Sequence, residues 1–201
     1  MNQVKTAPVR AGTHYRAVVI GGSAGSSEAL EAILRKLPGE FSLPVLTVLH
    51  LHASDDGSLS HHIATMTRLS VVEPCDKQAI VPGFLYTAPA NYHMLVERSW
   101  TVSLSIDGRV NWSRPSIDVL FESAAQAWGD ALIAVILSGA NSDGAKGMRA
   151  VRKAGGLTIA QQPSSARTTI MPQAAIDTGA VDMVLPADEI GTLLARISHA
   201  N

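Results

Sequence analysis

The sequence predicts a single α/β domain with an open, mostly parallel, doubly wound sheet of the Rossmann-like type and an antiparallel hairpin at one edge. Short apolar runs of strand length recur along the chain, and most of them precede a segment with helical spacing of its apolar residues. The 201 residues suffice for one such domain. A hydrophobic fraction of 46% against a charged fraction of 16% is typical of a compact protein with a largely buried sheet.

The first half of the chain predicts one side of this sheet and then breaks the rhythm. Two continuous apolar runs indicate buried strands, and Leu37-Pro38-Gly39 ends the helix between them. Alternating apolar residues later indicate the antiparallel pair that forms the edge hairpin. The expected elements are strand 17–20, helix 28–34, strand 43–49, helix 58–69, short strands 69–73 and 83–88 around a Pro82-Gly83 turn, and paired strands 94–97 and 100–106.

The second half alternates regularly between strands and helices. Arg114-Pro115-Ser116 precedes the first of its helices, and the strand that follows is the most apolar of the chain. A Gly-Gly pair ends the next helix, and Pro172 suits the first turn of a later one. The expected elements are helix 117–128, strand 130–137, helix 145–154, strand 157–161, helix 172–178, strand 181–185 and a last helix from 188 or 189 to 198.

Composition excludes several classes of protein. The net charge is −1, from 16 basic and 17 acidic residues, so no nucleic-acid or polybasic membrane contact is expected. Cys75 is the only cysteine, which excludes intrachain disulfides and a thiolate metal cluster. No apolar run reaches the roughly 18 residues of a membrane span, and the start lacks the apolar segment of a signal peptide. We expect a flexible tail over residues 1–15, a folded domain over residues 16–201, no membrane insertion and a cytoplasmic location.

The most informative stretch is the turn Gly21-Gly22-Ser23-Ala24-Gly25, between the first strand and the first helix. It fits the G-x-S-x-G nucleophile elbow, in the strand–turn–helix context that this motif requires. The dinucleotide motif G-x-G-x-x-G does not fit, because position 23 is serine, and no Gly-Lys-Ser/Thr follows to make a phosphate-binding loop. No cofactor is therefore expected. The alternative is that Ser23, Ser26 or Ser27 only caps the helix.

Two further strand ends carry residues that could serve a serine nucleophile. His50 follows the second strand and Asp143 follows the strand 130–137. Because ligands bind at the carboxyl ends of parallel strands, these loops are expected to converge on Ser23. Imidazole would take the serine proton, and a carboxylate would hold the imidazole in the required tautomer. His52 is the alternative base.

Each of these residues also has a simpler interpretation. His50 could merely end a strand, and Asp143 could belong to a turn that caps the following helix. Arg114 could be an ordinary surface charge. His50, His52, His61 and His62 could suggest a metal, but no acidic partner stands at a recognisable spacing, so no metal site is expected.

Taken together, separated segments of the chain from residue 17 to 197 resemble the catalytic domain of the bacterial chemotaxis protein-glutamate methylesterases. Any one segment would be weak evidence, whereas the set in this order is highly specific. The segments are VVIGGSAGSSEAL, the strand ending at His50, PGFLYTAPANYHM, SRPSIDVLFESAA, VILSGANSDGAKGM, AGGLTIAQ and MPQAAIDTGAV.

The resemblance implies hydrolysis of glutamyl methyl esters on chemoreceptor helices, with deamidation of receptor glutamines as an additional activity. The family's nucleophile, base and acid fall on Ser23, His50 and Asp143. Its oxyanion-stabilising backbone N–H groups fall near Ala24 and Ala140, and Arg114 lies in a matching segment as a candidate substrate-binding residue. Residues 16–201 would then be the methylesterase catalytic domain, and methylated chemoreceptor helices would be its partners. The oligomeric state is not predicted.

The sequence departs from the family pattern at several places. Ser26 and Ser113 stand where glycine and histidine are usual, and the proline that commonly follows the second strand is missing. The usual receiver domain needs roughly 120 residues, and no such segment stands before residue 17 in this sequence. If the chain is a whole protein, we expect constitutive activity or regulation by partners, and the alternative is that the chain is one domain of a longer protein. These departures motivate an alternative, a chemosensory binding module with the same fold and little or no esterase activity. A third alternative, a small-molecule carboxylesterase, is disfavoured by the order Ser, His, Asp.

Overall fold

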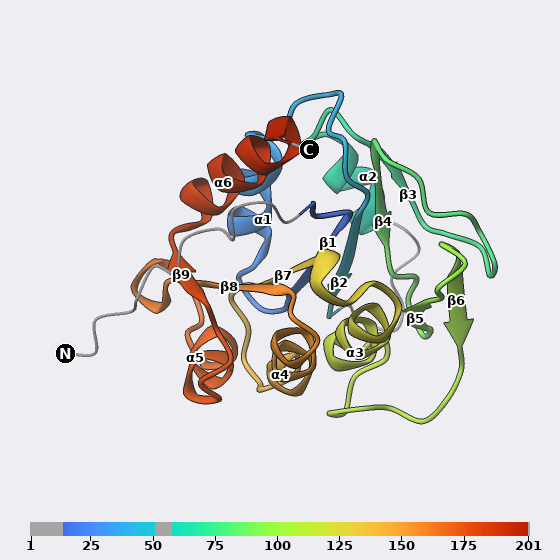
Figure 1. Ribbon diagram of the computed structural model, residues 1–201. Coiled ribbons are helices and arrows are strands. Elements are labelled where there is room, and N and C mark those ends of the chain that lie inside the picture. The colour runs from blue at the N-terminus through green and yellow to red at the C-terminus, as the bar shows by residue number, and fades with distance from the viewer. Residues whose placement is uncertain (1–13, 51–57, 201) are drawn as a thin grey trace.

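The computed structural model describes residues 14–50 and 58–200, which form a three-layered α/β fold with the sheet in the middle (Figure 1). The strands are β1 (Ala17–Gly22), β2 (Val45–Leu49), β3 (Ser70–Val72), β4 (Phe84–Thr87), β5 (His93–Val96), β6 (Val102–Ser105), β7 (Leu132–Ile136), β8 (Leu157–Gln161) and β9 (Met183–Leu185). The helices are α1 (Ser27–Leu34), α2 (Ser58–Ala64), α3 (Ile117–Trp128), α4 (Ala145–Lys153), α5 (Ile170–Asp177) and α6 (Ala187–Ala200). The predicted α/β class is confirmed.

Within the described ranges, seven strands form one parallel sheet in the order β3-β4-β2-β1-β7-β8-β9. The chain starts this sheet in its middle at β1 and adds β2, β4 and β3 on one side. It then returns to the other side of β1 with β7. The strand order therefore reverses between β1 and β7, and in open α/β sheets ligands bind at the carboxyl ends of the strands at such a point.

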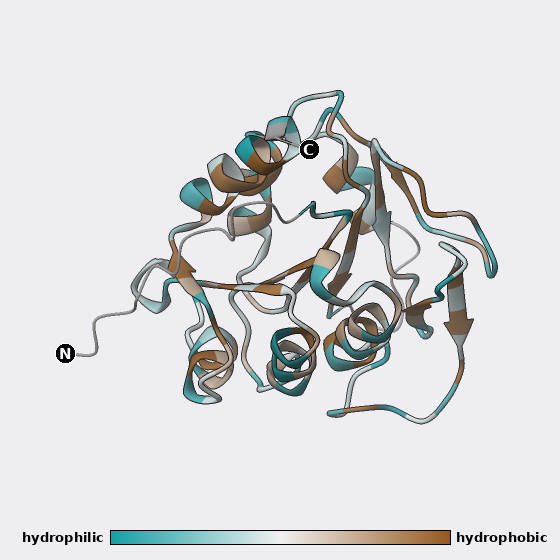
Figure 2. Cartoon of the chain, viewed as in Figure 1, coloured by the Kyte–Doolittle hydropathy of each residue, from teal (hydrophilic) through white to brown (hydrophobic). Residues whose placement is uncertain are grey.

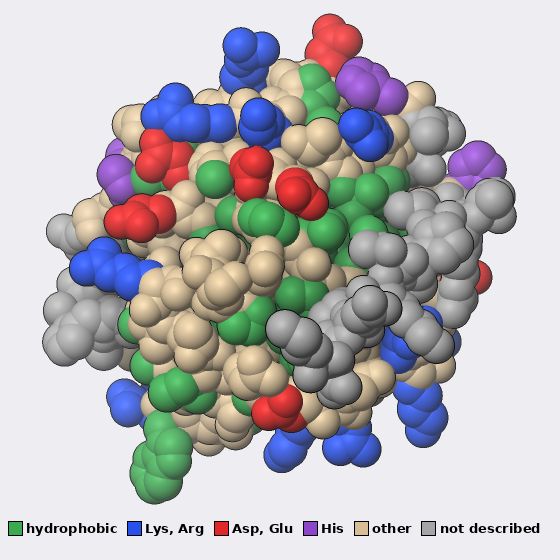
Figure 3. All heavy atoms as spheres, turned by 90° about the vertical axis from the view of Figure 1, so that its left-hand side faces the viewer, with side chains coloured by type: hydrophobic (Ala, Val, Ile, Leu, Met, Phe, Trp, Pro, Cys, Tyr) green, Lys and Arg blue, Asp and Glu red, His purple; other side chains and the backbone are tan. Residues whose placement is uncertain are grey.

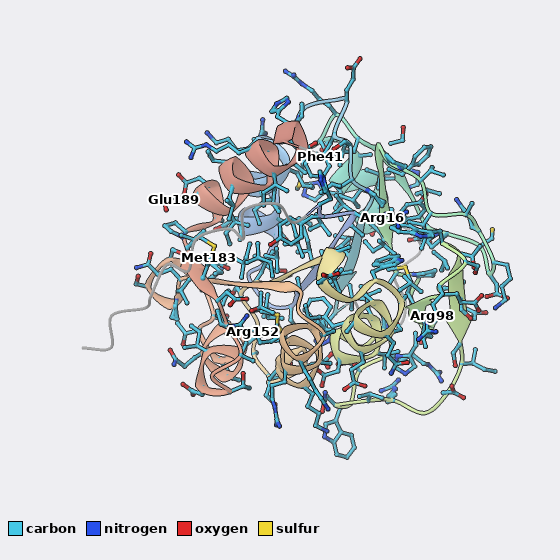
Figure 4. All side chains as sticks on the ribbon, viewed as in Figure 1. Arg16, Phe41, Arg98, Arg152, Met183 and Glu189 are labelled. Carbon is cyan, nitrogen blue, oxygen red and sulfur yellow. The ribbon has the colours of Figure 1, made fainter. Side chains whose placement is uncertain are left out.

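Apolar side chains fill the space between the sheet and the helices on both faces. The core on one face includes residues of α1, α2 and α6, and the core on the other includes residues of α3, α4 and α5 (Figure 1). Strand β1 serves both cores, because Val18 and Ile20 belong to the first and Ala17 and Val19 to the second. Figure 2 accordingly shows brown, hydrophobic residues along the central strands. Phe41, fully buried, lies near the C-terminal end of α6 (Figure 4).

The predicted edge hairpin is confirmed as a separate two-stranded sheet. Strands β5 and β6 pair antiparallel, with Met94 opposite Leu104, and both residues belong to or pack against the core that holds α3. Strands β3 and β4 run parallel to each other. The Pro82-Gly83 turn therefore ends a crossover and is not the tip of a second hairpin.

The first described residues already belong to the folded domain. The tail predicted over residues 1–15 lies mostly outside the described residues, but Tyr15 is only 3% exposed and joins the core. The backbone N–H of Arg16 donates to the carbonyl of Ala131, and the Arg16 guanidinium lies 4.5 Å from the centre of the Trp100 ring (Figure 4). Because Tyr15 is buried in the core and Arg16 is hydrogen-bonded next to β7, the folded domain reaches back at least to Tyr15.

The surface charge and the lengths of the helices relate to the predictions about binding partners and membrane insertion. On the face drawn in Figure 3, Lys and Arg side chains lie along both the upper and the lower parts, and Asp and Glu side chains lie mostly in the upper part. This face therefore carries both signs of charge, in keeping with the net charge of −1. Of the helices in residues 14–50 and 58–200, none has the length and apolar character that a membrane span requires.

Candidate active site

The serine turn joins β1 to α1 and presents Ser23 at the carboxyl end of the central strand. A Cβ atom at Gly21 would overlap the Ile117 side chain, so only glycine lets the end of β1 pack this closely on α3. Gly25 has φ of +75°, a left-handed conformation that glycine adopts without strain. Glycine at these two positions therefore sets the sharp bend that exposes part of Ser23.

Two neighbouring groups fix this turn. The backbone N–H and the hydroxyl of Ser26 both donate to the carbonyl of Ser23, at 3.0 and 2.7 Å. The N–H of Ser23 donates to the carbonyl of Ser138 at the end of β7, at 2.9 Å. Ser26 is only 2% exposed, so its hydroxyl takes part in closing the turn. The polar group of Ser26 is therefore satisfied within the turn.

His50 follows β2 directly and lies beside the serine turn. Its backbone N–H donates to the carbonyl of Gly22 at 3.1 Å, which continues the parallel β1–β2 register by one residue. Its side-chain Nε2 lies 2.8 Å from Oδ2 of Asp143, and the imidazole is 12% exposed. Because Nε2 is occupied by the carboxylate, Nδ1 is the ring nitrogen left to act on a substrate or a nucleophile.

Asp143 is fully buried and accepts hydrogen bonds at both carboxyl oxygens. Oδ2 accepts from His50 and from the backbone N–H of Ile117 at 2.7 Å. Oδ1 accepts from the Asn111 amide at 2.8 Å, the Ser116 hydroxyl at 2.9 Å and the N–H of Asp118 at 3.2 Å. The first N–H groups of α3 thus point at this carboxylate, which is where a negative charge is stabilised at a helix.

These contacts determine the charge of Asp143. Burial by itself would raise the pKa of the carboxyl, but the hydrogen bonds from His50, Asn111 and the N–H groups of Ile117 and Asp118 lower it to about 2. The carboxylate is therefore ionised at neutral pH. An ionised carboxylate on Nε2 keeps a proton on that nitrogen and leaves Nδ1 as an acceptor.

The three predicted residues come from the ends of adjacent central strands, β1, β2 and β7. Among the described residues, the Ser23 hydroxyl makes no hydrogen bond to His50 or to any other group. Catalytic hydrogen bonds are often long without substrate and tighten when it binds. Serine, imidazole and carboxylate at one end of one sheet can together carry out nucleophilic acyl transfer.

Backbone N–H groups near Ser23 are free to bind an anion. The N–H groups of Ala24 and Ala140 donate to no other residue in the described parts of the chain, and both residues are exposed. The Arg114 guanidinium is engaged differently, since its Nη1 donates to the carbonyls of Ile106 and Asp107 at 2.6 and 3.0 Å. Its role in substrate binding stays a prediction, as do the oxyanion roles of the two alanines.

The remaining predictions concern His52 as the alternative base and the histidines that could suggest a metal. His52 lies outside the described residues. In residues 14–50 and 58–200, no group of three or more His, Cys, Asp and Glu side chains is placed to hold a metal ion.

Sequence reasoning missed three residues that organise the site. Ser138 is buried, and its hydroxyl donates to the carbonyls of Ala24 and Thr168 and accepts from the N–H of Thr168. Asn111 and Asp118 form a hydrogen-bonded chain next to Asp143. Their only signal in the sequence is a polar residue within an apolar or loop segment. That pattern does not distinguish a buried hydrogen-bond network from a solvated surface.

Comparison with known proteins identifies the family of this chain. Residues 18–194 match the family model described as CheB methylesterase. This chain belongs to the CheB methylesterase family. A relative from Leptospira interrogans, named as a candidate protein-glutamate methylesterase/protein-glutamine glutaminase, is 44% identical over 94% of this chain and 97% of its own length. A Pseudomonas aeruginosa protein-glutamate methylesterase/protein-glutamine glutaminase is 38% identical over 89% of this chain, which spans about half of that relative's length.

The family fold is also found among solved structures. The crystal structure of the Thermotoga maritima CheB methylesterase catalytic domain matches this CheB-family chain with a TM-score of 0.87 and 32% identity. The match covers 92% of this chain and all of the other. Together with the sequence matches, this confirms the resemblance and the predicted catalytic-domain fold.

Proposed function

We propose that this protein is a protein-glutamate methylesterase that hydrolyses glutamyl methyl esters on chemoreceptors by a Ser23–His50–Asp143 triad. The observation that carries the proposal is the 2.8 Å hydrogen bond between His50 Nε2 and the buried Asp143 carboxylate, on a histidine whose backbone is bonded to the serine turn. Membership of the CheB methylesterase family supports the same reaction class.

In the proposed mechanism, Ser23 Oγ attacks the ester carbonyl while Nδ1 of His50 takes the hydroxyl proton. Asp143 stabilises the positive charge that forms on the imidazole. The tetrahedral intermediate collapses, the carbon–oxygen bond to the methoxy group breaks, and His50 returns the proton to release methanol. Water then attacks the acyl-enzyme with His50 as base, which frees the glutamate carboxylate and restores Ser23.

The N–H groups of Ala24 and Ala140 are our candidates for binding the oxyanion. Both lie in loops at the carboxyl end of the sheet, and their N–H groups are unpaired among the described residues. Removal of one such donor typically lowers kcat by about 10²–10³-fold. Because these donors are backbone groups, alanine in place of another residue at position 24 leaves the donor intact.

The substrate is expected to be the glutamyl ester on a methylated chemoreceptor helix, with receptor glutamine as a second substrate. An amide and a methyl ester pass through the same kind of tetrahedral intermediate, so one triad can serve both. Two relatives are named for both activities. Such a substrate places the protein in the cytoplasm, where Arg114 is a candidate for contact with the receptor.

The test is methanol release from methylated chemoreceptor by wild type, Ser23→Ala and Ser27→Ala. Ser27 is an exposed serine at the start of α1, four residues beyond Ser23, so it is a matched control. We expect wild type and Ser27→Ala to release methanol and Ser23→Ala to release none. Absence of release from wild type, with receptor binding retained, would instead support the binding-module alternative.

A further inference from the structure

We propose that Asn111 is a positioning residue that holds the Asp143 carboxylate in place for His50 and separates it from the second buried carboxyl, that of Asp118. This inference deepens the proposed esterase function and rests on it for its kinetic part. Asn111 belongs to the loop between β6 and α3 and lies outside the sequence motif of the serine turn.

The geometry is a bridge between two carboxyl groups. Nδ2 of Asn111 donates to Oδ1 of Asp143 and to Oδ2 of Asp118, both at 2.8 Å. Asp143 is fully buried and Asp118 is 2% exposed. Since both neighbours are acceptors, the amide must present its NH₂ group to them, and its two hydrogens are used one on each carboxyl.

The bridge matters because no lysine or arginine among the described residues pairs with either carboxyl. Within the same residues, the titratable side chains that interact with Asp143 are His50 and Asp118. Burial raises the pKa of Asp118, and the charges of Asp143 and Glu122 raise it further. An NH₂ group between two buried carboxyl groups lowers the repulsion between their charges. If the NH₂ group were removed or replaced by an acceptor, that repulsion would remain uncompensated.

Other groups anchor the surroundings and do not replace the amide. Oδ1 of Asp118 accepts from the N–H of Gly147 in α4. The buried His93 of β5 accepts from the N–H of Ser116 at 3.2 Å and lies 3.0 Å from the carbonyl of Gly108 through its other nitrogen. These contacts fix the helix and the loop, but among residues 14–50 and 58–200 only Asn111 contacts both carboxyl groups through one side-chain atom.

The backbone delivers the amide through a tight turn. Val110 and Ser113 exchange two backbone hydrogen bonds, and the residues between them have φ of +49° at Asn111 and +64° at Trp112. Two positive φ values at the tip are those of a type I′ turn, in which asparagine is favoured. The turn directs Asn111 at the two carboxyl groups, while Trp112 is 92% exposed.

This turn allows variants that separate the side chain from the backbone. Asn111→Gly removes the amide and keeps a residue that adopts positive φ easily. Asn111→Asp keeps the shape and the backbone tolerance but changes the donor. Its carboxyl can donate one hydrogen bond when protonated and none when ionised. Trp112→Gly is the matched control, because it alters the same turn without touching either carboxyl.

The first measurement is the hydrolysis of methylated receptor across pH, with the Tm of each variant recorded at each pH. We expect Asn111→Gly to lower kcat by about tenfold to a hundredfold, the worth of one hydrogen bond to a charged group, with little change in KM. The ratio of Asn111→Asp to wild-type kcat should be highest at acid pH and fall as the introduced carboxyl ionises. Trp112→Gly should leave kcat unchanged.

The second measurement does not need an active enzyme. Carboxyl-carbon NMR of wild type and Asn111→Gly gives the pKa of Asp143 directly, and we expect a higher pKa in the variant. If wild type releases no methanol, the proposed function fails while this titration still decides the positioning role. An unchanged pKa of Asp143 together with kcat within twofold of wild type in Asn111→Gly would overturn the proposal.

Discussion

Asp143→Asn is the substitution whose consequences follow most directly from the structure. The substitution replaces one carboxyl oxygen by an NH₂ group, whose hydrogens would face groups that are themselves donors. The Asn111 amide, the Ser116 hydroxyl and the N–H of Asp118 donate to Oδ1, and His50 and the N–H of Ile117 donate to Oδ2. Because Asp143 is fully buried, water cannot relieve the mismatch.

The stability change has two parts. The pKa of Asp143 falls from 3.8 to about 2, and at about 1.4 kcal/mol per pKa unit the ionised carboxylate contributes roughly 2 kcal/mol. Because the pKa is lowered in the folded protein, this contribution is complete above pH about 4 and disappears as the pH falls through about 2. Unsatisfied donors add about 1–3 kcal/mol. We expect Asp143→Asn to lower the free energy of unfolding by about 3–5 kcal/mol at pH 7.

The assay is urea unfolding at 25 °C, followed by tryptophan fluorescence, for wild type and variant between pH 7 and pH 3. The stability difference between the two proteins should shrink as the pH falls below 4. The same variant should lower kcat by roughly 10³–10⁴-fold, because the imidazole loses the partner that sets its tautomer. A stability difference that stays constant over this pH range would refute the argument from the ionised carboxylate.

Asp182→Asn provides the matched control for activity. Asp182 is also buried, accepts from the N–H and hydroxyl of Thr158, and pairs with Arg152 at 2.9 Å, away from the triad between β8 and β9. The control should lose stability through the same kind of unsatisfied donor and keep its kcat. Equal loss of kcat in both variants would mean that instability, and not the triad, causes the effect.

Three further substitutions test the framework of the site. Gly21→Ala places a methyl group on Ile117 and should cost about 1–3 kcal/mol, measured by urea unfolding, together with a fall in kcat as Ser23 shifts. Ser26→Ala removes the 2.7 Å hydrogen bond to the Ser23 carbonyl and should cost about 0.5–1.5 kcal/mol by the same measurement, with the N–H bond retained. Ser138→Ala removes a buried hydroxyl that joins three loops and should cost about 1–3 kcal/mol, and an unchanged Tm would contradict its structural role.

Much of the fold was predictable because its main strands can be recognised from the local sequence. The continuous apolar runs at β1, β2 and β7 indicate strands covered on both faces, and the glycines after β1 mark the turn. The boundaries of α3 and β8 agree with the prediction residue by residue. In contrast, β3 and β4 are short and carry no helix between them, so nothing local distinguishes a parallel crossover from a hairpin.

The site was predictable only as far as the residues follow strand ends. Ser23 and His50 stand directly after β1 and β2, so the topology brings them together. Asn111 could not be found in this way, because its contacts depend on a turn between β6 and α3. Long-range hydrogen bonds leave no periodic pattern in the sequence, so such positioning residues emerge only from the folded arrangement.

Asp143 contacts a helix N-terminus, as the simpler interpretation expected, but the helix is α3 and not the helix that follows Asp143. The sequence suggested a cap for the helix that follows, yet the N-cap position of α4 is Gly144, with φ of +92°. Asp143 instead receives the N–H groups at the start of α3, the helix on which Gly21 of the serine turn packs. One helix end therefore sets both the charge of Asp143 and the position of the turn that carries Ser23. A perturbation of Ile117, at the start of α3, should accordingly affect Ser23 and Asp143 together.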